Sequence, residues 1–98
     1  MMKSIHDIQD TLKALLPYLQ KIYHIEELSL FGSYVRNEQT DKSDVDILVS
    51  FTEAPSLFEF IELQDYIADH LQIKVDLVMK SAVKESMRKT ILKETVVL

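Results

Sequence analysis

The sequence predicts a single α/β (α+β) domain in which helices pack in two layers on a small mixed sheet of three or more strands. The chain has 98 residues, the length of one small domain, and 47% of them are hydrophobic, enough for one continuous core. Its apolar spacing switches between helical and strand periods in the order helix, strand, short helix, strand, helix, strand, helix. We therefore expect residues 1–98 to form one unit.

The first predicted element is a helix with an inward apolar face. Ser4 is a suitable N-cap, and Asp7 complements the positive end of the helix dipole. Pro17 lacks a backbone donor, which predicts a kink or a split near Leu16. The residues at three- and four-residue spacing are Ile5, Ile8, Leu12, Leu15, Leu16 and Leu19.

A short strand is expected over Glu27–Phe31, and it ends at Gly32, the only glycine of the chain. One helical turn is expected over Ser33–Asn37. Because P-loops and dinucleotide-binding loops need several glycines, a single glycine excludes both.

The middle of the chain predicts a strand and a helix. A polar turn over Asn37–Ser43 precedes a strand over Val45–Phe51, whose alternate residues should face the core. Ser56 and Glu59 have the spacing of a capping box, which predicts a helix to about Leu71. The side chains expected to point inward from this helix are Leu57, Phe60, Ile61, Leu63 and Ile67.

The last third predicts a strand over Ile73–Met79 and a helix over Ser81–Glu94. The apolar tail Val96–Leu98 could join a sheet edge or an oligomer interface. Strand order does not follow from these patterns.

Charge and composition exclude several classes of protein. The net charge of −5 and the pI near 5.1 argue against a broad nucleic-acid surface. The absence of cysteine excludes thiolate metal sites and a cysteine nucleophile, so any metal would be held by oxygen. No apolar run is long enough for a signal or membrane segment, so we expect a cytoplasmic protein without membrane contact.

Three aspartates are candidates for catalysis. Asp44 and Asp46 project from one side of a strand, because side chains alternate there, and Asp76 lies in the otherwise apolar third strand. Carboxylates about 4 Å apart repel by roughly 4 kcal/mol at an effective dielectric near 20, so a converging set predicts a divalent cation. Magnesium fits, since it accepts carboxylates together with substrate phosphates. A calcium-binding EF-hand is excluded because its glycine and terminal glutamate are missing, whereas a structural strand-end role for Asp44 stays open.

A second feature strengthens the catalytic interpretation. Gly32 and Ser33 precede Asp44 and Asp46 by ten intervening residues. Glycine lets the backbone approach a phosphate, and a serine that opens a short helix offers N–H groups and a hydroxyl to the same anion. The aspartate pair would then hold a metal ion bound to those phosphates.

The run LFGSYVRNEQTDKSDVDILVSF resembles the signature of the nucleotidyltransferase superfamily of DNA polymerase β, in its minimal form called MNT. The segments VDLV and ILKETVVL extend the similarity over residues 27–98. The resemblance implies a two-layer nucleotidyltransferase fold, two Mg²⁺ ions held by Asp44 and Asp46, and a role for Asp76 in completing one metal site and activating the attacking hydroxyl.

The same resemblance assigns the nucleotide contacts. Gly32 and Ser33 would hold the triphosphate of ATP, and Arg36 is a weaker candidate for a phosphate or partner contact. Asn37 departs from the pattern, because many relatives have glycine after the arginine.

Minimal members of the family resemble antitoxins that transfer AMP from ATP to a tyrosine of a cognate HEPN-domain RNase toxin. We therefore expect a protein adenylyltransferase with that partner, in a homodimer or hetero-oligomer and without direct nucleic-acid contact. The alternative is a non-catalytic antitoxin that masks the toxin and keeps a vestigial or sensing nucleotide site. A transferase acting on a small molecule is a third interpretation, weakened because relatives of that kind have an additional domain.

Overall fold

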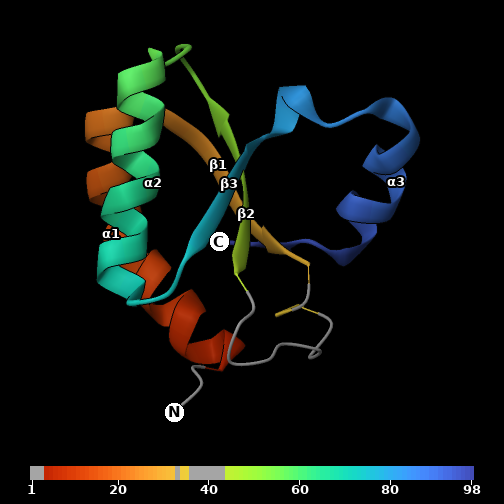
Figure 1. Cartoon of the computed structure of the whole chain (residues 1–98), viewed down its shortest axis with the longest axis horizontal. Helices are drawn as coiled ribbons and strands as arrows, with labels where there is room; N and C mark the ends of the chain where they lie inside the picture. The colour runs from red at the N-terminus through yellow and green to blue at the C-terminus, as the bar shows by residue number, and fades with distance from the viewer. Residues whose placement is uncertain (1–3, 33, 36–43) are drawn as a thin grey trace.

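The computed structural model describes residues 4–32, 34–35 and 44–98. Its elements confirm the predicted mixed α/β fold, with a sheet of four strands (Figure 1). In chain order they are α1 (Ile5–Tyr23), β1 (Ile25–Phe31), β2 (Val45–Phe51), α2 (Leu57–Leu71), β3 (Val75–Met79), the 3-10 helix η1 (Lys80–Ala82), α3 (Glu85–Glu94) and β4 (Val96–Val97).

The sheet is mixed, with the strand order β3-β2-β1-β4. β1 pairs antiparallel with β2 and with β4, whereas β2 and β3 run parallel because α2 connects them. The expectation that the apolar tail could join a sheet edge is confirmed, since Leu98 N–H donates to the Leu28 carbonyl at 2.9 Å.

The core lies between one face of the sheet and the helix pair α1 and α2, which lie side by side in Figure 1. Helix α3 lies on the opposite side of the sheet. The predicted alternation along β2 is confirmed for Val45, Ile47 and Val49, which are all buried. The largest fully buried side chains from the other elements are Ile8, Leu12, Leu19, Leu28, Leu30, Leu63, Ile67 and Leu71.

Both long helices begin at the predicted caps. The hydroxyl of Ser4 accepts from the Asp7 backbone N–H at 3.2 Å, and that of Ser56 accepts from the Glu59 N–H at 3.1 Å. The carboxylates of Asp7 and Glu59 complete the two capping boxes. The predicted split near Pro17 is wrong, because α1 continues through this residue to its last turn.

Two predictions about α2 and α3 need correction. Leu57 and Ile61 do not point inward: they are 72% and 47% exposed, and Phe58 beside them is 84% exposed. Helix α3 begins at Glu85, later than the predicted Ser81, because η1 occupies the first residues.

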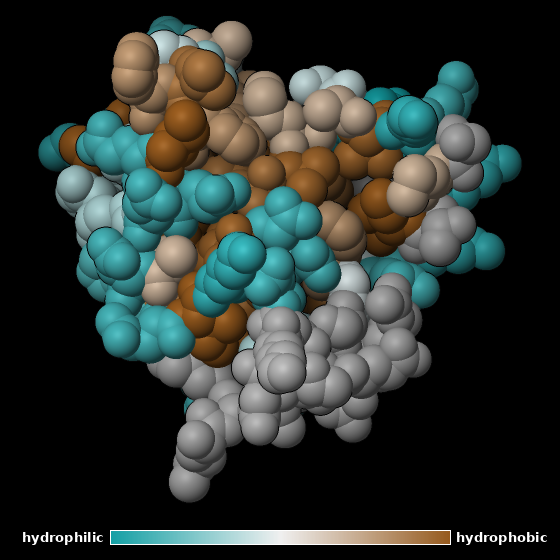
Figure 2. Space-filling model, viewed as in Figure 1, coloured by the Kyte–Doolittle hydropathy of each residue, from teal (hydrophilic) through white to brown (hydrophobic). Residues whose placement is uncertain are grey.

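Figure 2 shows apolar side chains gathered over the upper end of the helix pair and across the middle of the view. In the described part of the chain, no helix has the length and apolar character needed to cross a membrane.

Candidate active site

The aspartates lie on the sheet face turned away from α1 and α2. Val45 and Ile47 point into the core, so Asp44 and Asp46, which alternate with them, lie on the opposite face. Asp46 pairs with Asp76 across the parallel β2–β3 ladder. Neighbouring strands are about 4.8 Å apart, so the register places these two residues side by side on one face. Asp76 is exposed and Asp46 is half-buried.

Gly32 lies next to the Asp46–Asp76 pair. Phe31, the last residue of β1, pairs with Asp46, so Gly32 follows directly beside that carboxylate. Gly32 has a φ of +83°, and a Cβ atom on it would lie 2.9 Å from Asp46 Cγ and closer still to Oδ2. The Gly32 carbonyl accepts from the Val35 N–H at 3.1 Å, which closes a tight turn. The glycine is therefore required both by the backbone conformation and by the space that Asp46 occupies.

Two predicted site residues, Ser33 and Arg36, lie outside the described residues, as does Asn37. Among the residues that are described, no group of three or more histidine, aspartate or glutamate side chains is arranged to hold a metal ion. Magnesium commonly takes only one or two protein carboxylates and completes its shell with water and substrate phosphates. The oxygen donors of Asp46 and Asp76, on adjacent strands beside a glycine turn, are compatible with that mode.

Basic residues are concentrated in the segment that follows β3, on the side of the sheet where α3 lies. Residues 80–93, which include η1 and most of α3, contain five lysine or arginine residues and one glutamate, whereas the whole chain has a net charge of −5. Lys80 Nζ lies 3.7 Å from Glu27 Oε1 on β1. A concentration of positive charge on this side would attract a polyphosphate in an otherwise acidic protein.

The same face carries a small pocket at Leu48 that the sequence did not predict. Leu48 follows Asp46 by two residues and is buried, and it forms the floor of a small pocket whose other residues come from η1, α3 and the loop between them. Val83, Met87 and Ile91 recur at four-residue spacing, which predicts a helix but not the strand that it faces, so the pocket could not be anticipated.

Comparison with known proteins gives matches over nearly the whole chain. A family model described as a nucleotidyltransferase domain matches residues 12–98. The chain is 47% identical over 96 residues to a protein of Methanocaldococcus jannaschii that has the name of a protein adenylyltransferase, with 98% of each sequence covered. It is 46% identical over 95 residues to Protein adenylyltransferase MntA of Thermococcus cleftensis, with 97% of this chain and 96% of the relative covered.

Solved structures agree in fold. A chain assigned as a minimal nucleotidyltransferase superposes with a TM-score of 0.84 at 25% identity, covering 98% of this chain and 97% of that one. A chain from a crystal structure of a toxin-antitoxin with AMP-PNP superposes with a TM-score of 0.73 at 25% identity, covering 90% of this chain and 69% of that one. Similarity in sequence and in fold thus covers the same residues that form the sheet and its aspartates.

Proposed function

This chain belongs to the nucleotidyltransferase family and is a nucleotidyltransferase enzyme, and we propose that it is an antitoxin that transfers AMP from Mg-ATP to a tyrosine hydroxyl of a cognate HEPN RNase toxin. The observation that carries the proposal is the Gly32–Asp46–Asp76 arrangement, in a chain 46% identical to a protein adenylyltransferase over almost its full length. The toxin-antitoxin structure with AMP-PNP supports an adenine nucleotide and a protein partner.

In this proposal residues 1–98 form one minimal catalytic domain. Asp44, Asp46 and Asp76 would hold two Mg²⁺ ions, which when bound would neutralise the triphosphate and make the acceptor hydroxyl easier to deprotonate. The turn at Gly32 would let the backbone approach the phosphates, and Ser33 and Arg36 are proposed to contact them. We assign the acceptor hydroxyl to Asp76, because it is the most exposed of the three carboxylates.

The reaction is an in-line displacement. The acceptor oxygen forms a bond to the α-phosphorus of ATP, the bond from that phosphorus to the bridging oxygen breaks, and pyrophosphate leaves. The hydroxyl proton passes toward Asp76 and then to solvent. Positioning and charge stabilisation provide most of the catalysis in such transfers, which suits a small site made of carboxylates and a glycine turn.

The test is intact-mass spectrometry of the protein encoded beside this chain, incubated with this protein, Mg²⁺ and ATP. We expect mass increments of AMP with the wild type and none with Asp44→Asn/Asp46→Asn. Asp10→Asn, the same chemical change at an exposed position on α1, is the control and should act like the wild type. Peptide mapping would then identify the modified residue. No increment with the wild type would contradict the proposal.

A second candidate function, a masking antitoxin, is favoured by one observation. Phe58, Leu57 and Ile61 are exposed on α2, a helix with four acidic and no lysine or arginine residues. Such a surface could cover a basic, partly apolar RNase surface. If masking is the function, the double variant Asp44→Asn/Asp46→Asn should still inhibit the toxin fully, and the mass of the toxin should not change.

A further inference from the structure

The outer surface of the α1–α2 pair carries apolar side chains that the core does not use. Ile22 of α1 is 45% exposed, and Leu57, Phe58 and Ile61 of α2 are 72%, 84% and 47% exposed. Because α1 ends where α2 begins, these four side chains, here called the helix-pair patch, lie at one end of the pair, where Figure 2 shows apolar surface. Apolar side chains gathered in this way mark interaction sites more often than scattered ones do.

Neither the start of α2 nor the core accounts for the patch. The capping box is formed by Ser56 and Glu59 and does not involve Leu57 or Phe58. At 100° per residue, the side of α2 opposite Phe58 is the one that enters the core. The buried residues on that side are Leu63, Ile67 and Leu71. A partner that covered the patch would therefore remove from water apolar surface that folding leaves exposed.

Acidic side chains continue the patch along α2. Asp65 and Asp69 follow Ile61 by one and two helical turns, so they lie on the same face of the helix, and both are exposed. The whole helix has four acidic residues and no lysine or arginine. This face thus has an apolar end and an acidic end, which together are complementary to an apolar recess bordered by lysine or arginine.

The charges distinguish a basic protein from other occupants. An anionic membrane would be repelled by the acidic end of the face, and a second copy docked through the same face would place acidic residues against one another. The basic helix α3 of a second copy offers little apolar surface, because Met87 is the only large apolar side chain among those described on α3 that is exposed. A protein that is both basic and apolar at its surface fits better than any of these.

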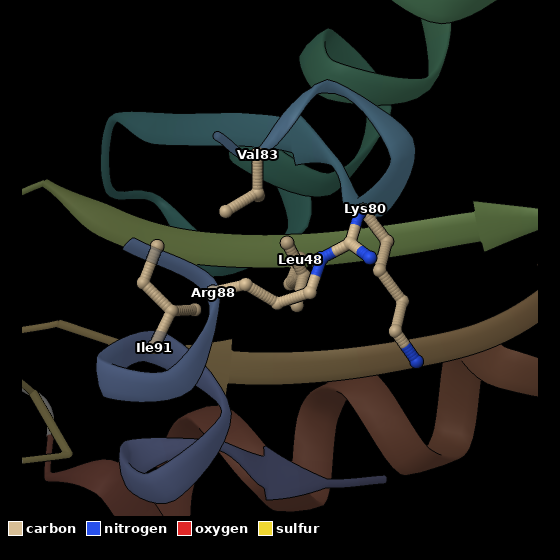
Figure 3. A pocket seen from close by; sticks show the side chains of 5 residues that line it. All are labelled: Leu48, Lys80, Val83, Arg88 and Ile91. Atoms are coloured by element: carbon tan, nitrogen blue, oxygen red, sulfur yellow. The ribbon is translucent and has the colours of Figure 1, made fainter. Parts of the chain in front are cut away.

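The opposite side of the domain would repel such a partner. In Figure 3 the side chains of Lys80 and Arg88 lie over the sheet around Leu48, on the side where α3 packs. Positive charge is therefore concentrated on the α3 side and negative charge on α2. This asymmetry would direct a basic protein to the helix pair.

The helix-pair patch is also remote from the aspartates. Asp46 lies near the start of β2, on the face turned away from α1 and α2, whereas the patch lies on the helices, at the end where β2 leads into α2. The five residues from Asp46 to Phe51 span roughly 17 Å along the strand. A surface docked on the patch would leave the aspartates open, so the acceptor hydroxyl would come from a segment that extends around the sheet or from another subunit of the partner.

We propose that the helix-pair patch and the acidic residues beside it dock the protein acceptor through a basic, partly apolar surface, at a distance from the catalytic site. The inference rests on the proposed nucleotidyltransferase function and adds the surface that selects the acceptor. Contacts far from the reacting atoms are equally strong before and during the reaction, so they lower the KM for the acceptor and leave kcat unchanged.

The test measures AMP transfer to the protein encoded beside this chain over a range of acceptor concentrations, and formation of the complex without nucleotide by calorimetry. Phe58→Ala should raise the KM for the acceptor and the Kd of the complex roughly ten- to a hundredfold, the scale expected for one phenylalanine buried at an interface. The kcat and the affinity for Mg-AMP-PNP should not change. Asp65→Lys should weaken the same complex, most strongly at low salt.

Met87→Ala is the matched control, since Met87 is an exposed apolar residue on the other side of the sheet, and it should leave the KM and the Kd unchanged. Urea midpoints equal to that of the wild type would show that all three variants fold.

Several outcomes would contradict the docking surface. Transfer by the wild type with an unchanged KM and Kd in Phe58→Ala would overturn it and leave the proposed function intact, and a tighter complex in Asp65→Lys would exclude a basic partner. Self-association of this chain that Phe58→Ala abolishes in sedimentation would make the patch a contact between copies. A complex that depends on Phe58 but gives no AMP transfer would instead support the docking surface and overturn the proposed function.

Discussion

Gly32 and Asp46 lie so close together that residue 32 has no room for a side chain: a Cβ atom there would be 2.9 Å from Asp46 Cγ. Gly32 directly follows β1 and Asp46 lies in β2, and the antiparallel pairing of Phe31 with Asp46 brings them together. The φ of +83° at Gly32 adds a backbone constraint that side-chain-bearing residues rarely meet. One residue thus sets both the direction of the chain after β1 and the position of a candidate metal-binding carboxylate.

We predict that Gly32→Ala lowers both stability and nucleotide binding. The left-handed backbone alone should cost about 1–2 kcal/mol, and the methyl group must also displace the Asp46 carboxylate. Urea unfolding would give the stability change and AMP-PNP titration the loss of binding. A variant with the wild-type midpoint and wild-type affinity would show that neither the turn nor the space at Gly32 matters.

Asp76→Asn should separate binding from catalysis. In the proposed mechanism Asp76 lies on the acceptor side, so its loss should reduce kcat by about 10²–10⁴-fold, the usual range for a group assisting proton transfer. Binding of Mg-AMP-PNP should change little, because Asp44 and Asp46 remain. Asp46→Asn should instead lose both catalytic activity and Mg-AMP-PNP binding. Single-turnover transfer rates and calorimetric titrations would distinguish the two variants, and equal loss of nucleotide binding in both would place Asp76 on the nucleotide instead.

Two serine substitutions should have opposite effects on stability. Ser56 caps α2, and Ser56→Ala should cost about 1 kcal/mol because it leaves the Glu59 N–H without its acceptor. The Ser50 hydroxyl is buried and has no hydrogen-bond partner within the described part of the chain. Ser50→Ala should therefore be neutral or stabilising by up to about 1 kcal/mol. Urea midpoints would test both, and a clear loss of stability in Ser50→Ala would indicate a partner for this hydroxyl.

Local signals in the sequence were enough to predict the elements that carry the candidate site. The alternation of Val45, Ile47 and Val49 located β2, and with it the common face of Asp44 and Asp46. The Ser56 capping box located the start of α2. These features depend on residues near one another in the chain, so pattern and propensity are sufficient.

Features that depend on residues distant in sequence could not be predicted in the same way. The pairing of Asp46 with Asp76 requires the strand order, which apolar spacing does not encode. The inward assignment of Leu57 and Ile61 failed because a helix covers the sheet with only one face, and Leu63 and Ile67 occupy it. Pro17 did not split α1 because flanking side chains such as Leu12 and Leu19 anchor the helix in the core, and tertiary packing outweighs one lost hydrogen bond.

Tyr23, at the end of α1, joins the two helices that cover the core. Its side chain is buried, and its hydroxyl donates to Glu62 Oε1 on α2 at 3.0 Å. Burial, together with the hydrogen bond and the negative charge of Glu62, raises the pKa of Tyr23 from 10.0 to about 12. Each cause disfavours the tyrosinate, so the folded protein holds this proton more tightly than the unfolded chain does.

We predict that Tyr23 makes stability fall with pH between about 10 and 12. Below pH 10 the folded and the unfolded protein both keep the Tyr23 proton, and the stabilisation by Tyr23 is complete. Above pH 10 the unfolded chain ionises first, and this stabilisation is lost as the pH rises through 12. Tyr23→Phe should cost about 1 kcal/mol at pH 9, where the hydrogen bond is intact, and less at pH 11. Urea unfolding of both proteins at the two pH values would measure this. If the difference between their midpoints did not narrow, ionisation of Tyr23 would not be coupled to folding.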